Sequence, residues 1–527
     1  MPGEGSGSAG TDHKLMSPRA ALSVANNVIG AVLGTAALVF IAKNMGPEVL
    51  GVLGFAIASV GILSFLSDFG VGSVHVLQIK SGEDLGKCIG AYAAIRLVLL
   101  AIFSVVTFAL IELWKWGYMG GDIPPSNALV DSMFVFLVYY VLLGINQIAT
   151  HTFDALGKSV NVYVPSILEL VVRVSFIIYV AVSAYGSSED GPAFLASAYA
   201  AGIVASTLLV SFFMSKVKIS MPDRAVLMKY IRSLAPVFVV SMIIILDLYL
   251  DKAVVGYFWG TRELGIYFGV QKMAIFVGVF SLSIATLILP SVTTYFFRKD
   301  HAATWDVVNQ AERYVSLVVI PTAAFYLVFG NDILNVFLTP QFAASVTTMD
   351  VLVVSSAVVA LVLPLRSVIA GIGKPATLFW IGAGGIVIQI ALMLVFVPED
   401  IAGVKMLGLK GLGAALSLLV SSIYYFFILR YMAWRTSRIL PVSQSFKHIL
   451  AAAVMIGVMY LVEWLLFPNV DWIALIVLAV VGIFSYGAAA YLLGELDTSD
   501  YRYFRSMLNP QGTLEYVVHE LLGKRGH

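Results

Sequence analysis

Four basic residues stand inside apolar stretches of this chain: Arg96, Arg173, Lys272 and Arg366. A charge within a bilayer is costly unless it faces a partner or a water-filled cavity. The guanidinium group of arginine forks onto phosphate oxygens, and lysine offers a compact positive charge. The four residues are therefore candidates for lining one cationic cleft, and such a cleft suits an anionic group such as a phosphate.

Carboxylates near these bases favour a structural alternative. Glu169 precedes Arg173 by one helical turn, a spacing that favours an ion pair. Asp247 and Asp251 precede Lys272 at a similar depth, so they are candidates for pairing with it, or for gating and coupling. The sequence leaves both interpretations open for these residues.

The remaining charged candidates lie near the ends of their stretches. Asp68, in "SDFGVG", either caps a helix break at Gly70 and Gly72 or gates the cleft. Arg96 and Arg366 either face the cleft or extend toward the lipid headgroups, as long basic side chains do near span ends.

Six amide side chains add uncharged polar atoms within the apolar stretches. They bind sugar hydroxyls in one interpretation and bridge helices in the other. These residues are Asn26, Asn27, Asn146, Gln147, Gln271 and Gln389.

Other kinds of chemistry find no support in the sequence. The seven histidines show no metal-ligand spacing, and the single cysteine, Cys88, excludes an intramolecular disulfide and a thiolate metal cage. "GKS" at 157–159 lacks the first glycine of a phosphate loop, which Thr152 replaces. No outer loop offers paired carboxylates, and a net charge of +1 gives no sign of nucleic-acid binding. We therefore expect no metal, no cofactor and no enzyme activity.

The elements that must position these residues are membrane-spanning helices. Of 527 residues, 60% are hydrophobic and 12% charged, whereas a soluble domain carries about 25% charged residues. Apolar runs of roughly 20 residues, each long enough to cross a bilayer as a helix, predict an all-α polytopic membrane protein. We expect about 14 transmembrane helices, over 19–42, 50–79, 89–113, 129–150, 160–184, 193–214, 231–257, 265–296, 314–329, 346–372, 376–397, 412–433, 449–467 and 472–493.

The basic residues between the spans predict orientation, because cytoplasmic loops carry an excess of Lys and Arg. One side of this map carries 22 Lys and Arg residues and the other carries 6. We therefore expect a multi-pass protein of the cell membrane with both termini in the cytoplasm.

Two short echoes predict a duplication. "GPEVLGV" at 46–52 returns as "GTRELGI" at 260–266, and "LGKSVNV" at 156–162 returns as "IGKPATL" at 372–378. Both offsets equal about six spans, so the halves enter the membrane in the same sense and form parallel repeats. The glycines permit tight turns, where φ is positive.

The predicted organisation is thus two parallel six-helix lobes with two extra C-terminal helices. It comprises a flexible cytoplasmic tail (1–16), an N-lobe (17–214), a cytoplasmic linker (215–230), a C-lobe (231–434), spans 13 and 14 (435–494) and a cytoplasmic tail (495–527).

Three stretches carry a family resemblance. "GPEVLGVLGFAIASVGILSFLSDFGVGS" (46–73) resembles the first outer turn and second helix of polysaccharide transporters in the multidrug/oligosaccharidyl-lipid/polysaccharide flippase superfamily. "LDLYLDKAVVGYFWG" (246–260) resembles their seventh span. "IAGIGKPATLFWIGAGGIVIQIALMLVFVP" (369–398) with "GLKGLGAALS" (408–417) resembles their tenth to twelfth spans.

The resemblance implies a flippase that moves a lipid-linked oligosaccharide to the outer leaflet by alternating access. Its expected partners are a polyprenyl-linked glycan, the lipid bilayer and glycan-assembly proteins. A cation-coupled drug exporter of the same superfamily is one alternative, although 19–42 contains no carboxylate. A lipid II-type flippase is another, and a membrane enzyme of cell-envelope synthesis is a third.

Overall fold

The protein, a computed structural model, is almost entirely helical. The structure describes residues 18–117, 126–183, 185–186, 188–279, 281, 295, 298, 300–371, 375–437 and 444–496. The predicted tail 1–16 and residues 497–527 of the predicted C-terminal tail lie outside these ranges. The first half contains α1 (Pro18–Asn44), α2 (Gly46–Leu63), α3 (Phe65–Asp68), α4 (Val71–Lys80), α5 (Leu85–Lys115), α6 (Asn127–Ala155), α7 (Ser159–Val182) and α8 (Gly191–Met214).

The second half begins with the longest helix of the described chain. Its elements are α9 (Arg224–Ile275), the 3-10 turn η1 (Phe276–Gly278), α11 (His301–Phe337), α12 (Pro340–Ala343), α13 (Val346–Gly371), α14 (Pro375–Phe396), strands β1 (Asp400–Ile401) and β2 (Val404–Lys405), α15 (Lys410–Ser437), α16 (Gln444–Leu466) and α17 (Trp472–Leu492). The strands pair antiparallel in a small hairpin.

The helices confirm a polytopic membrane fold. Within the described ranges, 12 helices other than α9 are long and apolar enough to cross a membrane. The number rises to 13 if the bent α9 is counted as one further span. α9 is 52 residues long, about 78 Å by helical rise, which is more than twice a bilayer core. It must therefore supply more than one span.

The chain reverses inside α9, at Gly260. This residue has φ 77° and ψ −178°, outside the helical region. A Cβ on Gly256 would lie 3.0 Å from the side chain of Leu264, whereas residues eight apart in a straight helix are separated by about 12 Å. We call residues 224–259 the first arm of α9 and residues 261–275 the second arm. The arms correspond to predicted spans seven and eight, and most of the predicted eighth span after residue 279 lies outside the described residues.

The echoed glycines let the two halves of the chain approach each other closely. A Cβ added to Gly51 would lie 1.7 Å from the carbonyl oxygen of Thr261, and one added to Gly265 would lie 1.7 Å from that of Pro47. Thr261 and Gly265 stand 214 positions after Pro47 and Gly51, so the two contacts are equivalent under the repeat. We call these four residues the glycine contact. It is the expected consequence of a two-fold pseudo-symmetry axis passing between α2 and the second arm.

Positive φ is confirmed at the two turns that precede this contact. Gly46 has φ 82° and Gly260 has φ 77°, a region that L side chains rarely adopt. The glycines of the echo therefore have two tasks, since one member of each pair turns the chain and the other lets two backbones touch.

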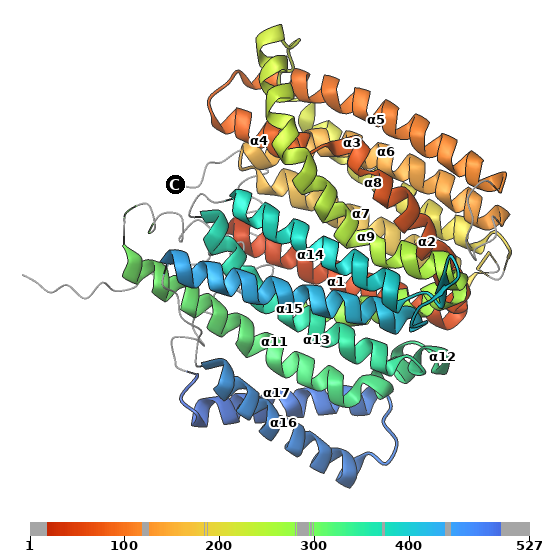
Figure 1. The fold of residues 1–527 in the computed structure, drawn as a ribbon, viewed down its shortest axis with the longest axis vertical. Coiled ribbons are helices and arrows are strands. Elements are labelled where there is room, and N and C mark those ends of the chain that lie inside the picture. The colour runs from red at the N-terminus through yellow and green to blue at the C-terminus, as the bar shows by residue number, and fades with distance from the viewer. Residues whose placement is uncertain are drawn as a thin grey trace, which may run out of the picture.

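The helices form two groups (Figure 1). One group contains α5, α6, α7 and α8; the other contains α11, α13, α14 and α15. α1 packs on α7, and α2 packs along both arms of α9. The two extra C-terminal helices, α16 and α17, pack on each other and on α11 at the edge of the second group.

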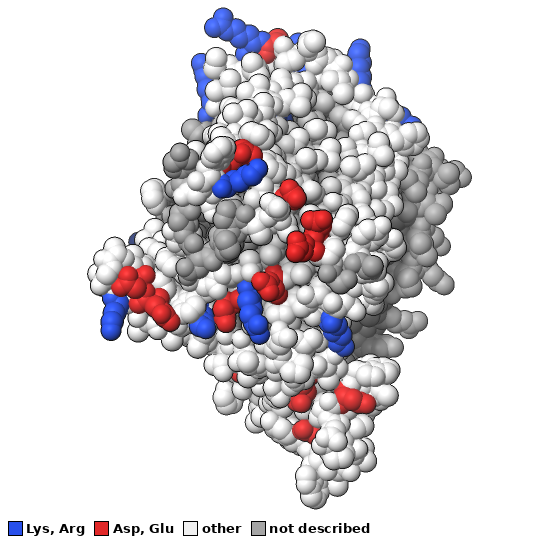
Figure 2. Space-filling model, turned by 90° about the vertical axis from the view of Figure 1, so that its right-hand side faces the viewer, with Lys and Arg blue, Asp and Glu red and all other residues white. Residues whose placement is uncertain are grey.

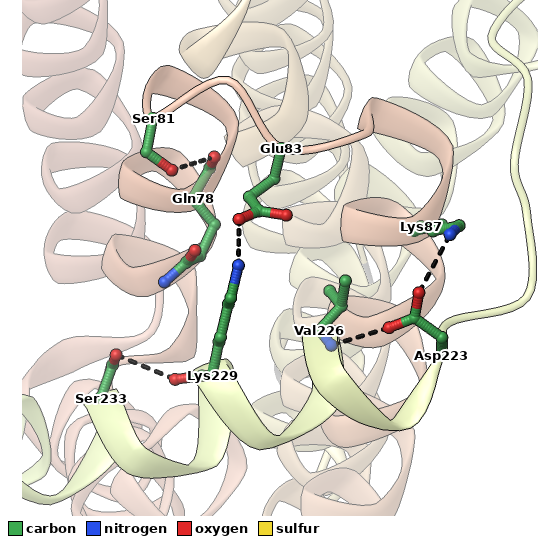
Figure 3. A network of polar contacts seen from close by, with 8 residues as sticks. All are labelled: Gln78, Ser81, Glu83, Lys87, Asp223, Val226, Lys229 and Ser233. Atoms are coloured by element: carbon green, nitrogen blue, oxygen red, sulfur yellow. Dashed lines mark hydrogen bonds and ion pairs between the residues drawn. The ribbon is translucent and has the colours of Figure 1, made fainter.

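The predicted linker is shorter than expected, because α9 already begins at Arg224 within 215–230. Asp223 caps this helix by accepting a hydrogen bond from the backbone N–H of Val226 (2.8 Å). Lys87 and Glu83, near the start of α5, pair with Asp223 and Lys229 (Figure 3). These ion pairs fasten the start of α9 to the first half of the chain.

The end of the bundle that carries α12, at the right of Figure 1, faces the viewer in Figure 2. Acidic and basic side chains are interspersed on this face, and Lys and Arg form no continuous patch there.

Candidate functional site

A cavity of about 970 Å³ lies between the two groups of helices. Its walls come from α1, α2, α7 and α8 on one side and from both arms of α9, η1, α13, α14 and α15 on the other. This volume is near the upper end of the range for small-molecule pockets, so the cavity has room for a ligand of several rings. Four charged residues line it: Arg173, Asp247, Lys272 and Arg366.

Arg173 is held on the N-lobe wall by a carboxylate and a ring. Its Nε lies 3.2 Å from Glu169 Oε1, which confirms the predicted ion pair. Its guanidinium carbon lies 4.8 Å from the ring centre of Tyr199 on α8. Gly202 permits this packing, since a Cβ there would lie 2.8 Å from the carbonyl oxygen of Glu169. The ion pair balances the charge of Arg173 while the ring fixes its direction.

Lys272 and Arg366 present their charges to the cavity from the C-lobe wall. Both side chains are exposed, although they lie within apolar helices. Lys272 Nζ lies 5.4 Å from the ring centre of Phe268, one turn earlier in the second arm. Neither base forms an ion pair among the residues that the structure describes. An aromatic face orients a cation without neutralising it, so the charge of Lys272 remains available to an anion.

The two carboxylates of the first arm have different surroundings. Asp247 is exposed to the cavity. Asp251 is buried, accepting hydrogen bonds from Tyr267 Oη (2.8 Å) and Gln271 Nε2 (2.5 Å) and pairing with Lys252 Nζ (2.9 Å). The partner of Asp251 is therefore Lys252 and not Lys272, and this network joins the two arms of α9.

Arg96 and Asp68 lie away from the cavity. Arg96 is 2% exposed and donates to Asp68, to Gln147 and, at 3.4 Å, to the carbonyl of Gly144. Asp68 ends α3 immediately before a helix break, where Phe69 and Gly70 both have positive φ. Asp68 thus marks the predicted break, and its carboxylate neutralises Arg96. The alternative prediction, that Arg96 extends toward the lipid headgroups, is wrong.

Three of the six amides join two helices or the two arms of α9. Asn146 donates to Ser206 (3.1 Å) and Thr207 (3.3 Å), and Gln147 accepts from Arg96. Gln271 donates to Asp251. Gln389 differs, because neither polar atom of its side chain has a hydrogen-bond partner among the described residues.

The sequence interpretation missed the rings beneath the two cations. Tyr199 lies 26 positions after Arg173, on the next helix, so no local spacing links them. Phe268 stands four positions before Lys272, and this i,i+4 spacing was a usable signal. Across the described residues, no group of three or more His, Cys, Asp or Glu side chains has an arrangement that would hold a metal ion.

Comparisons with known proteins agree with this fold. Residues 20–296, just over half of the chain, match a family described as "Polysaccharide biosynthesis protein". A relative from Haloferax volcanii, named as the probable low-salt glycan biosynthesis flippase Agl15, is 24% identical over 325 residues. That alignment covers 60% of this chain and 64% of the relative, so it spans less than two thirds of the relative's length.

Solved structures of low sequence identity share the architecture. One is described as the lipid II flippase MurJ in an inward closed conformation, with a TM-score of 0.70, 16% identity, and coverage of 90% of this chain and 98% of that one. Another is described as an inward-facing multidrug resistance MATE family transporter of the MOP superfamily, with a TM-score of 0.63, 15% identity, and coverage of 80% and 99%. At these identities the likeness shows the fold alone.

Proposed function

This chain belongs to the polysaccharide biosynthesis protein family, and on that premise we propose that it is a flippase for a lipid-linked oligosaccharide. The substrate would be a glycan joined through phosphate to a polyprenyl carrier. The protein would move it from the inner to the outer leaflet, with both termini in the cytoplasm.

The observation that carries this proposal is the charge of the cavity. Arg173, Lys272 and Arg366 line it against one carboxylate, Asp247. Phosphate oxygens pair with such bases, and the aromatic supports leave the charge of Lys272 exposed. The glycan would cross inside the cavity while the polyprenyl chain remains in lipid.

Alternating access follows from the two-lobed arrangement. The glycine contact holds the lobes together near the turns at Gly46 and Gly260, which the basic-residue asymmetry assigns to the outer side. Rocking of the lobes about the cavity would separate this contact and expose the cavity to the outside. The cycle thus requires a glycine contact that can form and break.

An exporter of organic cations is the alternative function, and its substrate would be positively charged instead of negatively charged. Such a protein needs an acidic cavity, and three of the four charged residues that line this one are bases. Asp247 is the carboxylate that such an exporter would use. Transport of a cationic dye in place of a lipid phosphate would favour that function.

Transport by the purified protein tests the proposal. Liposomes would contain a fluorescent glycosyl polyprenyl phosphate, and translocation would be followed by its accessibility to an added quencher. We expect Lys272→Gln and Arg366→Gln each to slow translocation at least tenfold, while Lys405→Gln, which removes an exposed charge from β2, behaves as wild type. Equal rates in liposomes with and without protein would contradict the proposal. Transport of lipid II alone would assign the chain to lipid II-type flippases.

A further inference from the structure

The amide of Gln389 is a polar group that the fold itself does not use. Gln389 lies in α14, is 0% exposed and lines the cavity. Both its Nε2 and its Oε1 lack a hydrogen-bond partner among the described residues. Burying an amide without a partner is unfavourable, because the group gives up its bonds to water. Its donor and its acceptor therefore lie at the cavity wall without a bond to any described residue.

Bridging, which accounts for Asn146, Gln147 and Gln271, does not account for Gln389. Asn146 and Gln271 each donate to a side chain of another helix or arm, so their loss would weaken the fold. Replacing Gln389 with an apolar residue removes an unpaired amide and no hydrogen bond between described residues. The fold would tolerate that change or gain stability from it.

Uncharged hydroxyl groups line the cavity on the two helices that pack against α14. Ser421 on α15 donates to the carbonyl of Gly385, one turn before Gln389 (3.0 Å). Ser355 on α13 and Ser422 on α15 bond to each other at 3.0 Å. All three serines line the cavity. We call Gln389, Ser355, Ser421 and Ser422 the neutral wall.

The neutral wall is separated from the nearest cavity-lining base on its own helices. Arg366 lies 11 residues beyond Ser355 on α13, about 16 Å away by helical rise. A phosphate held by Arg366 would thus leave the neutral wall to another part of the same substrate. An amide and hydroxyls both donate and accept hydrogen bonds, as do sugar hydroxyl and N-acetyl groups.

We propose that the neutral wall is a sugar-binding subsite that recognises hydroxyl or N-acetyl groups of the glycan, while the cavity bases hold its phosphate. This assignment rests on the flippase function proposed above. A site that hydrogen-bonds a substrate hydroxyl discriminates strongly against a ligand that lacks it. The neutral wall would therefore select the glycosylated carrier over the bare carrier.

Binding of two lipids by the purified full-length protein separates sugar recognition from phosphate recognition. The probes are a polyprenyl phosphate without sugar and the same carrier bearing an N-acetylhexosamine. Gln389→Met keeps the length of the side chain and removes both polar atoms. We expect this variant to bind the glycosylated carrier about tenfold more weakly, the effect of one lost hydrogen bond in a dry site, and to bind the bare carrier as wild type does. Lys272→Gln should weaken the binding of both.

The control variant is Ser417→Ala. Ser417 is buried on the same face of α15, bonds to the carbonyl of Gly413 (2.8 Å) and does not line the cavity, so its loss should leave binding unchanged. The melting temperature of ligand-free Gln389→Met should equal or exceed that of wild type.

Three results would overturn the sugar-binding subsite. The first is an equally weakened binding of both lipids by Gln389→Met, and the second is unchanged binding of both. The third is a lowered melting temperature of this variant without ligand, which would mean a structural role. If the wild-type protein binds neither lipid, the flippase function itself fails, and this outcome is distinct from the other three.

Discussion

Gly51→Ala tests the glycine contact that joins the two lobes. The new methyl carbon would lie 1.7 Å from the carbonyl oxygen of Thr261. A carbon–oxygen contact relaxes at about 3.3 Å, so the backbones must separate by roughly 1.6 Å. Overpacking of this kind costs about 1–3 kcal/mol. If the cost falls on the state in which the contact is closed, the equilibrium shifts toward the outward-open state by roughly 5- to 150-fold.

Thiol labelling from outside measures this shift. Cys88 is the single cysteine and is buried, so Cys88→Ala provides a background without a reactive thiol. Thr35→Cys then places a reporter in α1, on the cavity wall. A membrane-impermeant thiol reagent added outside intact cells should modify this reporter faster when Gly51→Ala is present. Gly265→Ala should have the same effect, because its clash with Pro47 is equivalent.

Gly487→Ala is the matched control, since a Cβ at this position in α17 would meet no atom within 4 Å. It should leave the labelling rate unchanged. If folded Gly51→Ala protein were labelled no faster than this control, the glycine contact would not be the outer closure and the reasoning would be refuted.

Three further predictions concern single contacts. Arg173→Ala combined with Glu169→Gln, which avoids an unpaired carboxylate, should abolish glycan export at a normal level of folded protein; retained export would remove Arg173 from the transport path. Tyr140→Phe should lower the free energy of unfolding by about 1 kcal/mol, because Tyr140 donates a hydrogen bond from α6 to Tyr249 on α9 (2.8 Å). In thermal unfolding, adding Tyr249→Phe should cause no further loss of stability, and additive losses of stability would contradict this. The Val226 N–H and Lys87 hold the pKa of Asp223 below its ordinary value of 3.8, so its ionised carboxylate stabilises the start of α9 fully above pH 3.8 and progressively less as the pH falls below that value. At neutral pH, Asp223→Ala should raise hydrogen exchange at residues 224–230 more than Asp223→Asn, which keeps a capping side chain; equal exchange in both would contradict the cap.

The sequence was sufficient for the features that depend on local pattern. Apolar runs gave the helices, because a bilayer requires a fixed length of apolar helix. The glycine echo predicted the repeat and the positive φ at Gly46 and Gly260. The spacing of Glu169 and Arg173 predicted their ion pair. None of these conclusions requires knowledge of how a helix is rotated about its axis.

Features that depend on helix rotation and on distant partners were not predictable. Arg96 and Arg173 look alike in sequence, yet Arg96 faces Asp68 and Gln147 inside the N-lobe and Arg173 lines the cavity. Asp247 and Asp251 lie one turn apart on nearly the same face of the first arm, so their different depths decide their neighbours, which are the second arm for Asp251 and the cavity for Asp247. For the two arginines, the rotation of about 100° per residue decides the outcome, and it is set by packing between helices.

The amides show the same limit. Gln271 and Gln389 are equivalent by composition, but only the structure shows that Gln271 is bonded to Asp251 and that the amide of Gln389 has no partner among the described residues. The proposed sugar-binding subsite rests on this difference.

The most direct test of the account is an electron cryomicroscopy structure of the protein with a bound glycosyl polyprenyl phosphate. We expect the phosphate inside the cavity, with its oxygens within hydrogen-bond distance of Lys272 or Arg366. A phosphate bound outside the cavity, with these two side chains facing only protein or lipid, would contradict the account.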